Sequence, residues 1–166
     1  LAGSAALIQT RQLGVARRML STPTSIAAIL GGTAFGRFGV ALVQAGYIVI
    51  GSLLIFGVEW GDPLGATALV VLFSLVSAGA GMLLGAVANN DQQAGGLGVF
   101  LGLLLAALGG SMAPLELCSP TMQTVAHITP HAWALDGFAE LVRRDGTLMD
   151  ILPELGVLAG YAAALF

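Results

Sequence analysis

The stretch PLGATALVVLFSLVSAGAGMLLGAVANN, residues 63 to 90, contains no charged side chain. A helix needs roughly 20 apolar residues to cross the hydrocarbon core of a bilayer, so this stretch is long enough to span it. Because every backbone polar group in lipid must be hydrogen-bonded internally, the stretch is expected to be helical. Residues 38–58 and 92–115 are also free of charge. Together these runs predict a bundle of transmembrane helices.

The composition of the whole chain agrees with this interpretation. The 166 residues are 57% hydrophobic and 9% charged, with a mean hydropathy of +0.91, whereas an ordinary soluble domain is roughly 25% charged. A soluble fold of this size exposes too much surface to hide so many apolar side chains. The net charge of −3 is small and dispersed, and we expect no nucleic-acid partner. We predict one all-α, polytopic transmembrane domain in contact with membrane lipid.

Turn-forming and polar residues divide the chain into segments. The expected segments are the end of a span at about 1–8, a polar region at 9–25, spans at 30–58, 64–88 and 93–112, an outer insertion at 113–150 and the start of a last span at 152–166. We expect the sequence to lack the beginning of the first span and the end of the last.

The insertion at 113–150 is expected to contain two short helices. Ser119 and Thr129 are each followed by proline, the pattern of a capping hydroxyl and a first-turn proline. In the second helix the apolar face is expected to be formed by Leu135, Phe138, Leu141 and Val142. Two amphipathic helices beside a membrane predict a re-entrant or interfacial cap on the outer side.

The arginines indicate which side is cytoplasmic. The six basic residues are all arginines, and four lie towards one side: Arg11, Arg17, Arg18 and Arg37. The positive-inside rule places that side in the cytoplasm. Arg37, near the end of a span, is expected to extend its guanidinium to the membrane interface. Gln44, inside the same span, is expected to hydrogen-bond another helix.

Small residues recur every four positions along two spans. One row contains Ser77, Gly81 and Gly85, and the other contains Ala94, Gly98, Gly102, Ala106 and Gly110. Small residues let helix backbones approach closely in lipid. The rows predict helix packing at Gly81, Gly85, Gly98 and Gly102, either within the chain or, alternatively, against a second copy.

Several kinds of chemistry are disfavoured. The chain has no lysine, so it cannot contain a GxxxxGK[ST] phosphate-binding loop, and we expect no enzymatic activity and no cofactor in this chain. His127 and His131 are four residues apart, near Glu116 and Cys118, but Pro130 begins a new helix between them. We therefore expect polar interfacial side chains rather than a metal site. The middle portions of the spans lack Asp, Glu and Lys, which disfavours an ion-coupled carrier.

Four motifs occur in a recognisable order: RRMLSTP at 17–23, FGV at 56–58, GGSMAPLE at 109–116 and ITPHAWALDGF at 128–138. With the order of spans, they resemble the membrane subunit of type-2 ABC exporters, the ABC-2 permease family. The resemblance covers essentially the whole chain, from the end of that family's second span to part of its sixth. The stretch IQTRQLGVARR, residues 8–18, departs from the family pattern because it lacks the usual acidic residue and Gly-Thr pair.

The resemblance implies that residues 9–25 contain a cytoplasmic coupling helix that docks on a separate ATP-binding subunit. The expected coupling residues are Arg11, Leu13, Gly14, Arg17, Arg18, Leu20 and Pro23. Leu13, Ala16 and Leu20 form a modest apolar row at helical spacing, which supports docking. The alternative is an arginine cluster that only sets topology. ATP and Mg are expected on the partner subunit, and a second permease copy or paralogue is expected to complete a dimer.

The resemblance also implies an outer gate in the insertion, with Pro114, Glu116, Pro130, His131 and Trp133 as its expected residues. The apolar spans favour a hydrophobic or amphipathic substrate, such as a drug, a lipid or a lipid-linked molecule, exported across a bacterial or archaeal cell membrane. Two alternatives stay open: a non-transporting membrane subunit for signalling or assembly, and the less favoured ion-coupled carrier.

Overall fold

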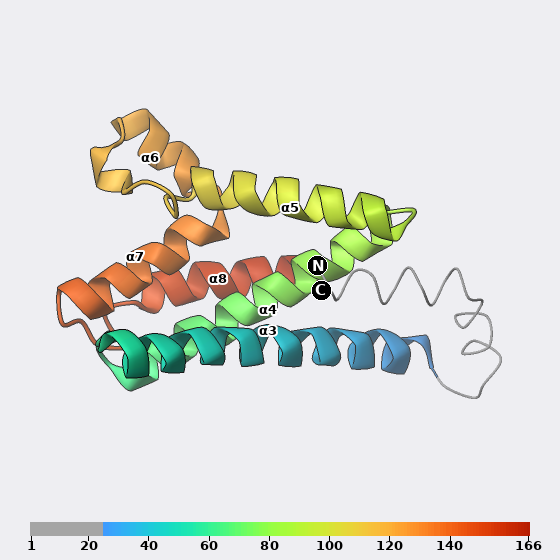
Figure 1. Cartoon of the computed structure of the whole chain (residues 1–166), viewed down its shortest axis with the longest axis horizontal. Helices are drawn as coiled ribbons and strands as arrows, with labels where there is room; N and C mark the ends of the chain where they lie inside the picture. The colour runs from blue at the N-terminus through green and yellow to red at the C-terminus, as the bar shows by residue number, and fades with distance from the viewer. Residues whose placement is uncertain (1–24) are drawn as a thin grey trace.

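The structure is a computed structural model that describes residues 25–166 (Figure 1). Its elements are the α-helices α3 (Ile26–Phe56), α4 (Pro63–Val87), α5 (Asp91–Leu108), α6 (Pro120–Ala126), α7 (Pro130–Arg143) and α8 (Leu152–Leu165), with a short 3₁₀ helix, η1 (Leu115–Leu117). The part of the chain described here contains no strand. The predicted all-α bundle is confirmed, while the expected coupling region at 9–24 lies outside the described residues.

Helices α3, α4, α5 and α6 begin at side-chain caps, whereas the Thr129 hydroxyl, which the sequence predicted to cap α7, makes no capping hydrogen bond. The Ser25 hydroxyl accepts a hydrogen bond from the Ala28 amide at the start of α3. The Asp62 carboxylate accepts from the amides of Leu64 and Gly65 at the start of α4. The Asn90 side chain accepts from Gln93 at the start of α5. Each cap satisfies amides that have no partner inside their helix.

The fourth span ends earlier than the sequence indicates. We predicted a span to residue 112, but α5 ends at Leu108. Gly110 has φ +89°, in the left-handed region that favours glycine, and it turns the chain out of the helix. A side chain on Gly109 would lie 2.7 Å from the Thr129 hydroxyl, so the end of α5 packs closely against the start of α7.

Two helices of the described region are long and apolar enough to cross a membrane. They are Ala27–Phe56, with a mean hydropathy of 2.1, and Pro63–Val87, with 2.2. The apolar stretches Gln92–Leu108 and Leu152–Leu165 are shorter. Bulky side chains of α3 such as Phe35 and Tyr47 are 76% and 79% exposed. An extended exposed apolar surface of this kind is typical of a protein that contacts lipid or other apolar segments.

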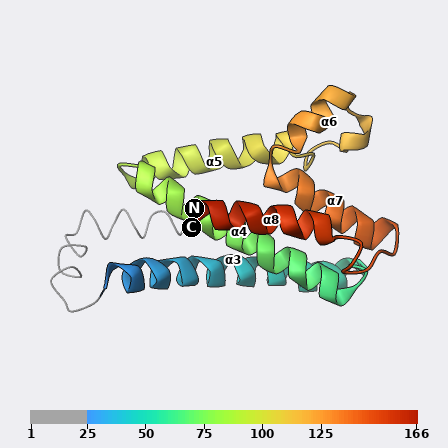
Figure 2. The ribbon, with the colours of Figure 1, turned by 180° about the vertical axis from the view of Figure 1, so that it is seen from behind.

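Helix α4 lies at the centre of the arrangement. It packs against α3, α8, α7 and α5, and the two opposite views show it crossing between them (Figures 1 and 2). The largest fully buried side chains are Leu69 on α4, Leu141 on α7, Leu158 on α8 and Ile151 just before α8. The core therefore lies between α4, α7 and α8.

Glycine and leucine alternate across the contact between α4 and α7. A side chain on Gly137 of α7 would lie 2.9 Å from the Leu69 Cδ2 of α4. In the reverse direction, a side chain on Gly65 of α4 would lie 2.9 Å from the Leu141 Cδ2 of α7. Each leucine thus occupies the space that a Cβ would take on the opposite helix, which holds the two backbones close together.

The buried face of α7 differs from the expected one. The residues that are buried on this helix are Ala132, Ala134, Gly137 and Leu141. Of the four bulky residues predicted to form the apolar face, Leu141 is fully buried, whereas Leu135 and Val142 are 37% and 40% exposed. Gly137 lies against Leu69 of α4 and Leu141 lies against Gly65, so the fit to the opposite helix, rather than hydrophobicity alone, decides which face packs.

The predicted small-residue contacts have different environments. A side chain on Gly81 would lie 3.1 Å from the Arg37 Nη1, and Gly85 is buried. Gly98 is half-buried, but Gly102 is exposed and a side chain there would meet no described atom within 4 Å. The described residues therefore do not pack closely against Gly102, contrary to the prediction of packing within the chain. Packing against a second copy stays a prediction.

Arg37 also lies differently from the expectation. Its side chain is 8% exposed and lies between α3 and α4, beside Gly81, instead of extending away from the bundle to the interface. The missing side chain of Gly81 provides the room for the guanidinium.

We predict that Gly61→Ala destabilises the protein more than Gly57→Ala. Both glycines have positive φ, +72° and +64°, so each substitution costs about 1–2 kcal/mol of backbone strain. A methyl group at Gly57 meets nothing, whereas at Gly61 it falls against the Leu141 carbonyl and adds about 1–3 kcal/mol of overpacking. Thermal unfolding of the full-length variants in detergent measures the difference. Equal midpoints would show that the α3–α4 turn does not pack on α7.

Candidate functional site

The insertion between α5 and α8, residues 113–150, forms a unit that we call the outer hairpin. It consists of η1, α6 and α7. Helix α7 begins beside the end of α5, at the contact of Gly109 with Thr129, and ends beside the α3–α4 turn, at the contact of Gly61 with Leu141 (Figures 1 and 2). The hairpin therefore connects the end of α5 to the end of α3.

The turn between α6 and α7 is held by side chains that reach its backbone carbonyls. The last carbonyls of a helix have no partner within the helix, so in an apolar setting they need other donors. Three consecutive carbonyls receive one each: Thr129 donates to Ala126 at 2.8 Å, Trp133 Nε1 to His127 at 2.7 Å, and the Tyr161 hydroxyl to Ile128 at 2.6 Å. The donors come from the cap of α7, from α7 itself and from α8.

These contacts place the turn alongside the middle of the bundle. Tyr161 lies about 14 Å along α8 from its first residue, Leu152, at 1.5 Å per residue. The His131 ring stacks edge-to-face on Phe73, with ring centroids 5.2 Å apart, and Phe73 lies about 15 Å along α4 from Pro63. The turn therefore contacts both helices more than two turns from their first residues, and a re-entrant or interfacial cap stays a prediction.

The two histidines contact different groups. His127 Nδ1 lies 2.7 Å from the Gln123 carbonyl oxygen, and Nε2 lies 2.7 Å from Asp136 Oδ2. The carbonyl contact, followed by Asp136, raises the pKa of His127 despite partial burial. Burial lowers the pKa of His131. Within residues 25–166 no three His, Cys, Asp or Glu side chains gather as a metal-binding cluster.

The rim of the hairpin carries exposed ion pairs. Arg143 Nη1 lies 2.8 Å from Glu116 Oε1 and joins the end of α7 to η1, with side chains 63% and 72% exposed. Arg144 pairs with Glu140 one turn earlier on α7 at 2.7 Å, the pairing that their spacing favours. Exposed pairs of this kind contribute about 0–1 kcal/mol each to stability, so they add little to the stability of the hairpin.

The expected gate residues lie at two levels of the hairpin. Pro130, His131 and Trp133 lie at the inner turn, whereas Pro114 and Glu116 lie at the rim beside η1. Their role in gating stays a prediction. The expected coupling residues Arg11, Leu13, Gly14, Arg17, Arg18, Leu20 and Pro23 lie outside the described region, which begins at Ser25.

Sequence reasoning missed the tertiary role of Asp62. Its carboxylate caps α4 and also accepts a hydrogen bond from the Leu148 amide at 2.9 Å. It thereby joins the α3–α4 turn to the loop that follows α7. The capping role was readable from Asp62 followed by Pro63, but Leu148 lies too far along the chain for any local pattern to indicate the second contact.

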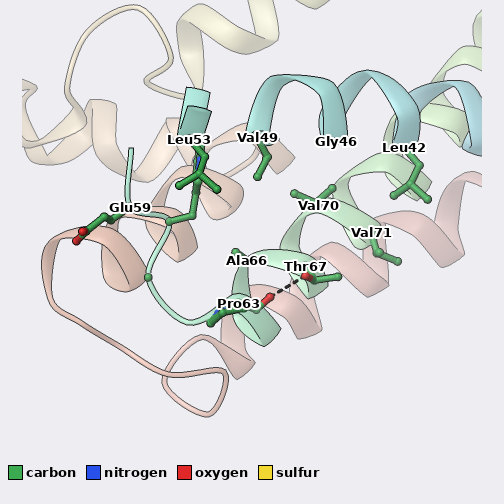
Figure 3. Close-up of a pocket in the computed structure, with 12 residues that line it drawn as sticks. Leu42, Gly46, Val49, Leu53, Glu59, Pro63, Ala66, Thr67, Val70 and Val71 are labelled. Atoms are coloured by element: carbon green, nitrogen blue, oxygen red, sulfur yellow. Dashed lines mark hydrogen bonds between the residues drawn. The ribbon is translucent and has the colours of Figure 1, made fainter. Parts of the chain in front are cut away.

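A groove of about 660 Å³ lies between the outer halves of α3 and α4 (Figure 3). Its lining is almost entirely apolar: Leu42, Gly46, Val49 and Leu53 from α3, Pro63, Ala66, Thr67, Val70 and Val71 from α4, and Glu59, Trp60 and Gly61 from the turn. Thr67 donates its hydroxyl to the Pro63 carbonyl at 2.7 Å, so this hydroxyl is already bonded within α4. Glu59 is the one charged residue among the lining residues.

Trp60 connects this groove to the outer hairpin. Its Nε1 donates to the Ser52 hydroxyl of α3 at 3.1 Å. Its ring packs edge-to-face against Phe138 of α7, with centroids 5.3 Å apart. One indole therefore contacts α3, the groove and the hairpin. A displacement of any one of them would change the contacts of the indole with the other two.

Comparison with known proteins places the chain in a family. The model of a family described as ABC-2 family transporter protein matches residues 1–166. The chain is 28% identical over 160 residues to the linearmycin resistance permease protein LnrN of Bacillus subtilis (strain 168), an alignment that covers 96% of this chain and 42% of that relative. No solved structure matches it. Since the family match extends over every residue, the chain belongs to the ABC-2 family of transporter proteins.

Proposed function

We propose that this chain is the core of a permease subunit of an ATP-driven exporter in a bacterial or archaeal cell membrane, moving a hydrophobic or amphipathic molecule outward. Membership of the ABC-2 family supports a membrane subunit of an ABC transporter. LnrN is named as a resistance permease, which supports outward transport in this chain too. The observation that carries the proposal furthest is the position of Trp60 between α3 and the outer hairpin.

In the proposed mechanism, α3 transmits a displacement from its cytoplasmic end to the outer hairpin. The expected coupling segment, residues 9–25, leads directly into α3 at Ile26, and the other end of α3 holds Trp60 through Ser52. A displacement imposed on the cytoplasmic end by the partner ATPase would therefore reach Phe138 and α7 through one indole. ATP binding and hydrolysis, with Mg, take place on that partner, and a second permease copy or paralogue completes the pathway.

The groove between α3 and α4 supports an amphipathic substrate. Aliphatic side chains from both helices line it, and Figure 3 shows Leu42, Val49 and Val70 turned into the space between them. Glu59 lies at the end nearest the turn, where it would meet a cationic or hydrogen-bond-donating head group. An apolar body with a polar end fits such a lining.

Filling the groove is expected to impair transport. Gly46→Leu adds a side chain where a Cβ meets nothing within 4 Å, so it occupies groove space without a clash. We expect about a tenfold or greater loss of efflux of a fluorescent amphipathic dye, because contacts in an apolar pocket are worth about 1–3 kcal/mol. The matched control is Gly36→Leu on the same helix, also open but outside the groove. Equal efflux by the two variants would exclude the groove from the pathway.

The proposed orientation is tested at Cys118, which lies in the outer hairpin after η1 and is half-buried. A membrane-impermeant maleimide is expected to label it in intact cells, with Cys118→Ser as the unlabelled control. Other cysteines of the full-length protein are first replaced by serine. Labelling only after the cells are opened would reverse the topology and place the hairpin on the cytoplasmic side.

The coupling role is tested at Arg17 and Arg18. Reversing both charges, with Arg17→Glu and Arg18→Glu, is expected to leave the permease inserted but weaken its complex with the ATPase, by on the order of 1 kcal/mol for each partly exposed contact. ATPase stimulation and transport should fall together. Co-purification and transport assays measure the effect.

The control for the arginine variant is its topology, read from Cys118 labelling. Loss of orientation would identify the arginines as topology signals, as the positive-inside rule allows. Normal orientation with undiminished ATPase binding and transport would rule out coupling. Undiminished ATPase binding without transport in the unmodified protein would favour a non-transporting subunit.

A further inference from the structure

The imidazole of His127 lies between two hydrogen-bond acceptors. On one side Nδ1 is 2.7 Å from the carbonyl oxygen of Gln123, one turn earlier in α6. On the other side Nε2 is 2.7 Å from Asp136 Oδ2 on α7. Neither acceptor can donate a proton while Asp136 is ionised, so the ring satisfies both contacts only when both of its nitrogens carry hydrogen. The arrangement selects the imidazolium form.

A neutral ring must give up one of the two contacts. If Nδ1 keeps the proton, the ring stays on Gln123 and the Nε2 lone pair faces the Asp136 carboxylate. If Nε2 keeps the proton, the contact with Asp136 remains but the Nδ1 lone pair faces the Gln123 carbonyl oxygen. Either tautomer replaces an attraction by a repulsion at 2.7 Å, and the link between α6 and α7 weakens.

Few polar contacts hold η1 and α6 to α7. Gln123 Nε2 donates to the carbonyls of Leu115 and Cys118, at 3.0 and 3.1 Å, so η1 and α6 form one piece. Two ion pairs of the described region then join this piece to α7: His127 with Asp136, and Glu116 with Arg143. Only the first contains a group that titrates between pH 5 and 8.

Several other side chains on and around the hairpin have partners of their own. Glu140 pairs with Arg144 on α7, and the His131 ring packs on Phe73 of α4. The Tyr161 hydroxyl of α8 donates to Ile128, and Trp133 packs edge-to-face on the His127 ring, with centroids 5.0 Å apart, while donating to the His127 carbonyl. The hydrogen bonds of Tyr161 and Trp133 and the packing of His131 on Phe73 do not involve the His127 ring, so the turn stays anchored when the link to Asp136 weakens.

We propose that His127 is a proton-binding site that closes the outer hairpin. With the proton bound, the imidazolium holds the η1–α6 piece on α7 through Asp136. When the proton leaves, that piece loosens about the anchored α6–α7 turn. The side chains of His127 and Asp136 are 34% and 44% exposed, so the protein does not enclose the site. The outer face of the protein thus senses the pH of the compartment that it faces.

The direction of the effect follows from the pKa of His127. The contacts with Gln123 and Asp136 raise this pKa above its ordinary value of 6.5. A group whose pKa is raised by folding contributes its full stabilisation below the ordinary value and loses it as the pH rises through the raised one. The closed hairpin is therefore favoured below pH 6.5, and it opens at higher pH.

Hydrogen exchange of the full-length permease with its ATPase, in lipid nanodiscs, tests the proposal. The readout is the protection factor of residues 119–127, corrected for the pH dependence of intrinsic exchange and compared with a peptide from α4. Protection of α6 is expected to fall several-fold between pH 5.5 and 8.5, while α4 stays unchanged. His127→Gln should remove this pH dependence, and Asp136→Asn, which keeps the size of the side chain, should move the midpoint to lower pH.

Two control variants separate the proton site from general loosening. Glu116→Gln weakens the other ion pair and should lower α6 protection at every pH without moving the midpoint. Glu140→Gln breaks a pair within α7 and should change nothing in α6. A pH profile that survives in His127→Gln, or α6 protection that is constant from pH 5.5 to 8.5 in the unmodified protein, would overturn the proposal.

Discussion

The reciprocal packing of leucine against glycine between α4 and α7 is the contact on which the rest of the structure depends. Leu69 occupies the space beside Gly137, and Leu141 occupies the space beside Gly65. Both leucines are fully buried. In lipid, burial alone gives little drive for helices to associate, so a close fit of this kind supplies the attraction. It fixes a short outer helix against the central span of the described region.

Because α7 is fixed against α4, the α6–α7 turn is carried alongside the bundle, where its carbonyls need partners that water would otherwise supply. Thr129, Trp133 and Tyr161 are those partners, and Tyr161 comes from α8, the helix that completes the core. The polar arrangement of the hairpin is thus a consequence of its apolar packing. The His127–Asp136 contact lies beside the same turn and is partly exposed, so a change in charge there can occur without exposing the core.

The same packing brings together segments that are far apart in the chain. Trp60 contacts Ser52 of α3 and Phe138 of α7, and Asp62 joins the start of α4 to the amide of Leu148. The α3–α4 turn therefore joins the end of α3, the start of α4 and the hairpin. Rigid elements joined through a few specific side chains transmit displacement better than a uniformly apolar interface would.

The sequence by itself determined the class of fold and the order of its elements, because uncharged runs, caps and prolines act locally: Asp62 before Pro63 begins α4, and Ser119 before Pro120 begins α6. It also indicated the family through motifs. Only the tertiary structure decided that the small residues of α7 face α4 and that Gly102 has no described neighbour. Contacts such as Tyr161 with Ile128 join residues far apart in the chain, and hydrophobic periodicity carries no information about which distant backbone a helix approaches.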